Sequence, residues 1–221
     1  MVHRIKLSDR HLPNYTIGEE IMNMVTHIAG GGLGILVLIL CVIKAANVSS
    51  RIGAIVYGST MITLYSISSV YHGLRPSTGK KVMQVLDHCA IYFLIAGTYT
   101  PLLLSAYMPR YPFIGLGVLV LQWGLCALAT TLTAIDLRRY RVLSMICYIG
   151  MGWSVIFFIP QTIAVLSLSG FYWLLAGGIA YTVGAILYGI GVKKRWMHSV
   201  FHIFVVIGSL LQFIAIYGYA L

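Results

Sequence analysis

Charged side chains are scarce in this sequence, and their scarcity excludes most classes of protein. Only 9% of the 221 residues are charged and only five are acidic, whereas a soluble domain is usually about 25% charged. Cysteines are also few, and the four present form no CxxC pair and lie inside apolar runs: Cys41, Cys89, Cys126 and Cys147. These absences exclude an ordinary soluble enzyme, a disordered segment and a disulfide-stapled secreted domain.

Long apolar runs are what the sequence has in abundance. Hydrophobic residues make up 59% of the chain, and a membrane helix needs roughly 20 of them in a row. Seven such stretches run over about Ile21–Ile43, Ile52–His72, Val82–Tyr107, Phe113–Ile135, Val142–Ile159, Phe171–Val192 and Met197–Ala220. Proline is expected to end the second and fifth stretches, at Pro76 and Pro160, and to kink the third at Pro101. We therefore predict an all-α fold, a seven-transmembrane helix bundle over 21–221, after a cytoplasmic N-terminal tail over 1–20.

Basic residues are distributed unevenly between the loops. The tail and every second loop contain Arg4, Lys6, Arg10, Arg75, Lys80, Lys81, Arg138, Arg139, Arg141, Lys193, Lys194 and Arg195. The intervening loops contain only Lys44, Arg51 and Arg110. Because cytoplasmic loops collect Lys and Arg, this split predicts a multi-pass protein of the plasma (inner) membrane with a cytoplasmic N-terminus and an exterior C-terminus. The net charge of +10 is then a topological signal, and we expect no nucleic acid as a partner.

Several familiar membrane and nucleotide signatures are missing. The tail lacks the order of a cleaved signal peptide, so the first helix is expected to act as the targeting signal. The glycines at 30, 31, 32 and 34 follow no strand and precede no Lys-Ser/Thr pair, which excludes a phosphate-binding loop. Gly30 and Gly34 instead have the spacing of a close helix contact. The seventh stretch has no lysine for a retinal Schiff base.

Polar residues inside the apolar stretches are the best candidates for function, because burying them in lipid is unfavourable unless they are paired or used. They gather in three places: Ser68 and His72 at the end of the second stretch, Asp87 early in the third, and His198 and His202 early in the seventh. At about 1.5 Å per residue, all of them lie roughly 4–10 Å inside the neighbouring basic residues. Their common depth favours a single site.

The histidines have the spacing of a metal site. His198 and His202 are four residues apart, so both imidazoles project from one helical face, and His72 would supply a third nitrogen. Three protein ligands with an open fourth position are typical of catalytic zinc. Zinc lowers the pKa of a bound water to about 7. Asp87, the only acid inside a predicted stretch, is the candidate to orient or deprotonate that water, and Ser68 to hydrogen-bond the water or a substrate carbonyl.

Other interpretations of these polar residues are less specific. His88 points about 100° away from Asp87 on a helix, so we expect it to have a supporting or structural role. His27 is isolated in the first stretch and is expected to be a packing residue. The whole set could also be satisfied polar residues that tie the helices together.

The same residues give the chain a resemblance to a known family. The segments SSVYH at 68–72, DHCAIYFLIAGTYTP at 87–101 and HSVFHIFVVIGS at 198–209 resemble the bacterial hemolysin III branch of the progestin and adipoQ receptor (PAQR) family. The resemblance covers essentially the whole chain. It implies a zinc ion, Zn²⁺, held by His72, His198 and His202, with the family's serine and aspartate positions falling on Ser68 and Asp87.

The resemblance also implies a function. Relatives in the wider group look like intramembrane lipid amide hydrolases with ceramidase-like activity, and bacterial members carry the hemolysin name and are linked to membrane lipid homeostasis. We therefore expect a zinc-dependent hydrolase of lipid amide or ester bonds. Its partners would be membrane lipids, including ceramide- or fatty-acid-containing ones. Two alternatives stay open: a non-enzymatic cytolytic membrane protein, and a receptor-like sensor with structural zinc.

Overall fold

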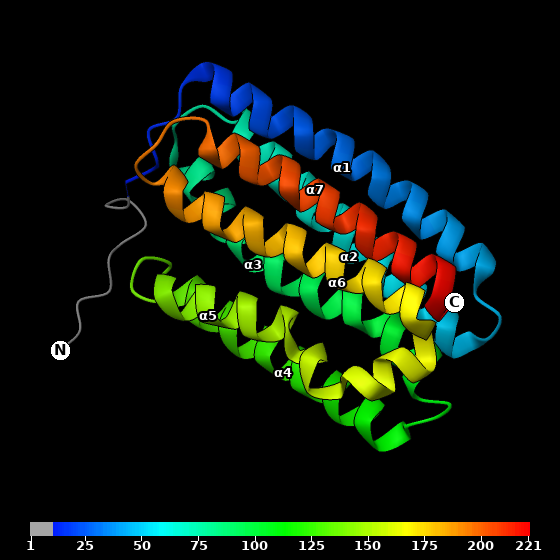
Figure 1. The fold of residues 1–221 in the computed structure, drawn as a ribbon. Coiled ribbons are helices and arrows are strands. Elements are labelled where there is room, and N and C mark those ends of the chain that lie inside the picture. Colours follow the sequence, from blue (N-terminus) through cyan, green and yellow to red (C-terminus); the bar gives the residue numbers. More distant parts are fainter. Residues whose placement is uncertain (1–10) are drawn as a thin grey trace.

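The computed structural model describes residues 11–221, which are helical apart from short connections (Figure 1). The helices are α1 (Ile17–Lys44), α2 (Val48–Gly73), α3 (Thr78–Pro101), α4 (Pro112–Ile135), α5 (Arg141–Gly152), α6 (Ile159–Gly191) and α7 (Met197–Ala215). Shorter π or 3-10 segments continue α3, α5 and α7: η2 (Leu102–Tyr107), η3 (Ser154–Phe158) and η4 (Ile216–Ala220). The described residues contain no strand, so the all-α prediction is confirmed.

Side-chain caps decide where the first helices begin. Thr16 and Glu19 form a capping box, in which Thr16 Oγ1 accepts from the Glu19 backbone N–H at 3.3 Å and the Thr16 N–H donates to the Glu19 carboxylate at 2.8 Å. α1 therefore begins at Ile17 rather than Ile21 and includes both Glu19 and Glu20 in its first turn. Of the predicted tail, residues 1–10, with Arg4, Lys6 and Arg10, lie outside the described residues.

At two prolines and one serine, the helices differ from those predicted from the sequence. At Pro101, where a kink was expected, α3 gives way to the π-helical segment η2, so the helical path continues to Tyr107. Pro160 lies in the first turn of α6, where a missing N–H is tolerated. The expected loop over 161–170 is instead helical on both sides of a break at Ser167, whose φ is 64° and ψ 169°.

The break lets one long apolar segment double back. Arg141–Gly191 is a 51-residue apolar stretch, and Figure 1 shows α5 and α6 running in opposite directions along it. Six helices of the described chain, counting this stretch as one, are long and apolar enough to cross a membrane by length and composition.

Close contact between α1 and α2 depends on glycine. A Cβ added at Gly30 would lie 2.5 Å from the ring of Tyr65, and one added at Gly34 would lie 3.2 Å from the backbone nitrogen of Ile62. The two helices therefore approach to a distance that larger residues would not allow, which confirms the predicted helix contact.

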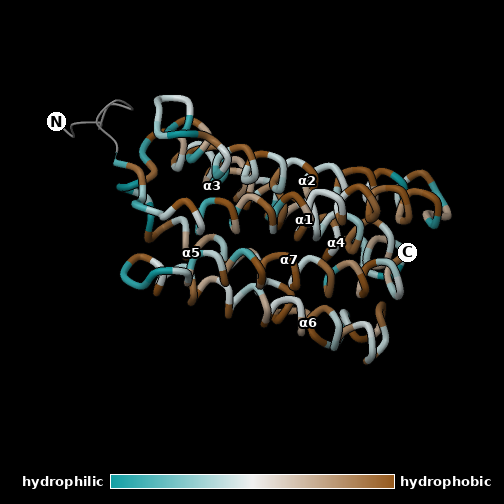
Figure 2. Tube along the Cα trace, turned by 90° about the horizontal axis from the view of Figure 1, so that it is seen from above, coloured by the Kyte–Doolittle hydropathy of each residue, from teal (hydrophilic) through white to brown (hydrophobic). Residues whose placement is uncertain are grey.

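The two ends of the bundle are polar and its sides are apolar. Figure 1 places the start of α1 and the loops 74–77, 136–140 and 192–196 at one end, opposite the C-terminus and the loop 45–47. Figure 2 shows hydrophilic segments gathered at the ends, with hydrophobic residues along the helices. Large apolar side chains are exposed on the sides, as at Phe157 and Val120, which suits a lipid-facing surface.

Candidate metal centre and adjoining cavity

The structure brings three histidines from two helices together. His72 lies in the last turn of α2, and His198 and His202 lie in the first two turns of α7. All three are buried, and one ligand atom from each falls within 4.8 Å of the others. The Nε2 atoms of His198 and His202 are 3.1 Å apart. Tetrahedral zinc with Zn–N bonds of 2.0–2.1 Å keeps its nitrogens about 3.3 Å apart, so this pair already has nearly the spacing of two ligands.

Unpaired polar atoms at the cluster support its fit to a metal. His72 Nε2 and Ser68 Oγ are buried without a hydrogen-bond partner, although most buried polar atoms in proteins have one. Ser68 lies one turn before His72 on α2. A divalent cation would give His72 Nε2 the partner that it lacks. The three histidines therefore form a group that could bind a metal ion.

An acid that the sequence prediction overlooked contacts this cluster. Nδ1 of His72 donates to Glu20 Oε2 at 2.6 Å, and Lys80 Nζ donates to Glu20 Oε1 at 2.5 Å. The prediction that Asp87 is the only acid inside a span is therefore wrong, because α1 includes Glu20. The missed signal is local: Glu20, Asn23 and His27 are spaced by three and four residues and share one helical face.

His27, although isolated in the sequence, lies against the three-histidine cluster. Its ring stacks on that of His202, with centroids 3.8 Å apart and planes 26° apart, and it meets Tyr65 edge-on. Both of its ring nitrogens are buried without a hydrogen-bond partner. His27 also lines the cavity described below, so its packing role, which stays a prediction, would be played beside the candidate metal centre.

The segment before α1 covers the cluster at the end of the bundle. The ring of Tyr15 stacks on that of His198, with centroids 4.8 Å and planes 22° apart. Burial raises the pKa of the Tyr15 hydroxyl, and the nearby negative charges of Glu20 and Asp87 add to the rise. The Trp196 backbone N–H donates to Glu19 Oε1 at 2.6 Å, so the first turn of α1 also holds the connection into α7.

Asp87 and His88 lie beside the cluster in different ways. Asp87 lines the same cavity as Ser68 and His202. It is not one of the residues whose ligand atoms lie within 4.8 Å of one another. His88 lines the same cavity, but its ring nitrogens have partners: Nδ1 is 2.8 Å from the Gln84 carbonyl and Nε2 is 3.3 Å from the Tyr188 hydroxyl. The roles predicted for Asp87 and Ser68 stay predictions.

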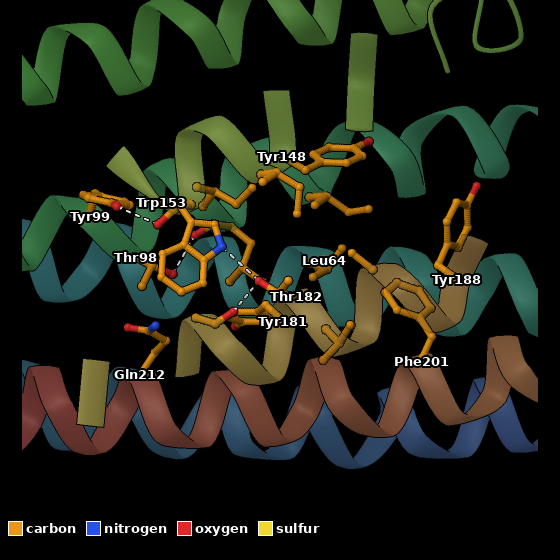
Figure 3. Close-up of a pocket in the computed structure, with 18 of the residues that line it drawn as sticks. Leu64, Thr98, Tyr99, Tyr148, Trp153, Tyr181, Thr182, Tyr188, Phe201 and Gln212 are labelled. Carbon is orange, nitrogen blue, oxygen red and sulfur yellow. Dashed lines mark hydrogen bonds between the residues drawn. The ribbon is translucent and has the colours of Figure 1, made fainter. Parts of the chain in front are cut away.

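A long apolar cavity extends from the histidines into the bundle. Its volume is about 320 Å³. Figure 3 shows Tyr188 and Phe201 at one end of it, and Tyr99 and Gln212 at the other. Ring contacts of Tyr188 and Phe201 with His198 identify the first end as the histidine end. His202 and Gln212 are ten residues apart on α7, so the cavity extends about 15 Å from the cluster.

Together these features define a multi-pass helical membrane protein with a buried three-histidine cluster that opens onto an apolar cavity. The chain belongs to the family described as Haemolysin-III related, which it matches over residues 15–213. The resemblance to the hemolysin III branch of the PAQR family is thus confirmed, and so is the prediction of a multi-pass plasma-membrane protein.

Individual relatives cover most of the chain. It is 37% identical over 208 residues to a Bacillus subtilis (strain 168) protein named Hemolysin-3 homolog, which covers 93% of this chain and 96% of that protein. It is 38% identical over 208 residues to Hemolysin-3 of Bacillus cereus, with 93% of each chain covered. Heptahelical transmembrane protein 5 of Arabidopsis thaliana is 28% identical over 152 residues, which are 60% of this chain and 40% of that protein.

Proposed function

We propose that the protein is a zinc-dependent hydrolase of lipid amide or ester bonds. The observation that carries the proposal is the buried group of His72, His198 and His202 at one end of a long apolar cavity. Zn²⁺ held by these histidines would polarise a carbonyl and make water a nucleophile at neutral pH.

The residues around the cluster suit the other tasks of such a reaction. Asp87 lines the cavity near the cluster, and a carboxylate there can orient water and accept its proton. Ser68 Oγ is buried and has no hydrogen-bond partner, so it is available to donate to a substrate carbonyl. Tyr15 stacks on His198 at the end of the bundle and limits the access of bulk water.

The shape of the cavity supports membrane lipids as substrates. Apolar side chains from α3, α6 and α7 form most of its wall, including Ile91, Leu94, Leu174 and Val205. A single acyl chain would fill such a cavity and gain free energy by burying its methylenes. The reacting amide or ester of a ceramide- or fatty-acid-containing lipid would then lie at the histidine end, and its cleavage would serve membrane lipid homeostasis.

We also propose seven membrane crossings with a cytoplasmic N-terminus and an exterior C-terminus. The reversal between α5 and α6 (Figure 1), the basic loops gathered at one end and the name of the heptahelical relative support this topology. Alkaline phosphatase fused to the C-terminus should be active, and a fluorescent protein fused there should be dark. The opposite pattern would overturn the topology and move the histidine cluster to the outer leaflet.

Asp87→Asn tests the hydrolase proposal. The change preserves size and hydrogen-bonding atoms but removes the basic carboxylate, so zinc content should stay and lipid turnover should fall by about 10²–10⁴. Mass spectrometry of membrane lipids, or of added ceramide, in cells that express each variant measures the effect.

The matched control is Asp136→Asn at the end of α4, where the carboxylate accepts from the backbone N–H groups of Arg138 and Arg139. This control should retain turnover. If Asp87→Asn leaves lipid composition unchanged, the hydrolase proposal fails, and a structural zinc in a non-catalytic membrane protein becomes the better account.

Cytolysis is the second candidate function, because the Bacillus cereus relative is named Hemolysin-3. Erythrocyte lysis by purified wild-type protein and by Asp87→Asn separates the two functions. Equal lysis by both forms without lipid turnover would favour a cytolytic protein, whereas lysis that depends on Asp87 would make it a consequence of lipid hydrolysis.

A further inference from the structure

Side chains from three helices meet at Nδ1 of His72. Glu20 comes from the first turn of α1, His72 from the last turn of α2 and Lys80 from the first turn of α3. The Glu20 carboxylate accepts from both partners, at 2.6 Å from His72 Nδ1 and 2.5 Å from Lys80 Nζ. Lys80 also donates to the Leu74 carbonyl at 2.9 Å, which ties the group to the end of α2.

This arrangement selects one tautomer of His72. A neutral imidazole has one N–H donor and one bare acceptor nitrogen, while an ionised carboxylate can only accept. The side-chain nitrogen of Asn23 is 3.4 Å from the same Nδ1, but the 2.6 Å contact with Glu20 is much the shorter. Glu20 therefore puts the hydrogen on Nδ1. Nε2 of His72 is then the acceptor nitrogen. The same atom is buried without a hydrogen-bond partner, and His72 belongs to the candidate metal-binding group with His198 and His202.

Lys80 offsets the unfavourable burial of the Glu20 carboxylate by pairing with it. The Lys80 side chain is buried and that of Glu20 is only one-fifth exposed, and a carboxylate in such surroundings loses much of its hydration. The Lys80 ammonium group, 2.5 Å from Glu20 Oε1, replaces part of that hydration. Its bond to the Leu74 carbonyl also fixes where the carboxylate lies.

We propose that Glu20, held by Lys80, is the positioning residue that presents His72 Nε2 to the metal. The inference rests on the proposed zinc centre and assigns part of its affinity to a carboxylate on α1. Outer partners of metal-bound histidines fix the tautomer and ring orientation, and losing one typically lowers metal affinity 10–100-fold.

Zinc affinity of the full-length protein in detergent tests the inference. Wild type, Glu20→Gln and Glu19→Gln are each titrated with Zn²⁺ against chelators of graded affinity. Glu20→Gln should bind zinc 10–100-fold more weakly. Glu19→Gln is the matched control, because it removes the same charge from the same turn but Glu19 contacts Thr16 and Trp196, not a histidine. Its zinc affinity should stay within a factor of about three of wild type.

The outcomes separate this inference from the proposed function. If wild type binds no zinc, the metal centre itself is wrong and the inference fails with it. If wild type binds zinc and Glu20→Gln binds it equally well, only the positioning role is overturned. An equal loss in both variants would show a general effect of charge, which would also overturn it.

A second measurement needs no variant and decides the matter even if Glu20→Gln fails to fold. Nitrogen-15 NMR of His72 in the zinc-loaded wild-type protein should show the metal on Nε2 and the proton on Nδ1. Metal on Nδ1 would overturn the inference, because that nitrogen would then be unable to donate to Glu20.

Discussion

The two ends of the cavity differ in whether their buried polar groups have hydrogen-bond partners. At the histidine end, His72 Nε2, Ser68 Oγ and both nitrogens of His27 are buried without a partner. At the far end, Tyr99 donates to the Gly152 carbonyl at 2.8 Å and accepts from the Val155 N–H at 3.2 Å. The indole of Trp153 donates to Thr182 Oγ1 at 2.9 Å, as Figure 3 shows.

Polar atoms without partners mark the end of the cavity that is expected to bind a ligand. A buried polar group that finds a partner within the protein stabilises the fold, and the far end contains such groups, with the Gln212 Oε1 atom as an exception. A buried polar group without one is unfavourable for folding by about 1–3 kcal/mol. Several such groups around one cluster therefore indicate a partner from outside the chain, which is a metal ion in our proposal.

The largest expected effect comes from removing two ligands at the histidine end. His198→Ala combined with His202→Ala should reduce zinc from about one ion per chain to almost none. The loss should also lower thermal stability, because metal at a hundredfold excess over its Kd stabilises a folded protein by about 2.7 kcal/mol. Elemental analysis and thermal unfolding with and without chelator measure both effects. Full zinc occupancy in this double variant would show that the site is assigned wrongly.

A change at the far end should affect stability without affecting metal. Tyr99→Phe keeps the ring but leaves the Gly152 carbonyl and the Val155 N–H without the hydroxyl that pairs them. We expect the free energy of unfolding to fall by about 1–3 kcal/mol, with zinc content unchanged. Denaturant unfolding in detergent and elemental analysis provide the test. Zinc loss in Tyr99→Phe would contradict the separation of the two ends.

The smallest expected effect on stability comes from Ser68→Ala. Ser68 Oγ has no partner, so its removal breaks no hydrogen bond and relieves the burial of a polar atom. Stability should therefore stay the same or rise by up to about 1 kcal/mol, while lipid turnover falls. The same unfolding assay, run beside Tyr99→Phe, measures it. A loss as large as that of Tyr99→Phe would mean that the Ser68 hydroxyl has a structural partner.

Much of the candidate site follows from the sequence, because depth in a membrane can be counted along a helix. His72, His198 and His202 lie at similar distances from basic loop residues, and the structure brings these three together. Glu20 was missed because two adjacent acids resemble a loop, although Thr16 and Glu19 have the spacing of a capping box. The helical character of 161–170 was missed because serines and a glycine there resemble a turn.

Hydropathy and spacing along the chain are enough to predict a membrane protein, its helices and the height of each polar residue along them. These properties depend on hydropathy, turn residues and a fixed rise per residue, which are all local. Lateral position is not local. Only packing decided that α1 places Glu20 against His72 Nδ1 and His27 against the ring of His202. Two residues at the same height can lie on opposite sides of a bundle, and the contacts between whole helix faces determine which of them meet.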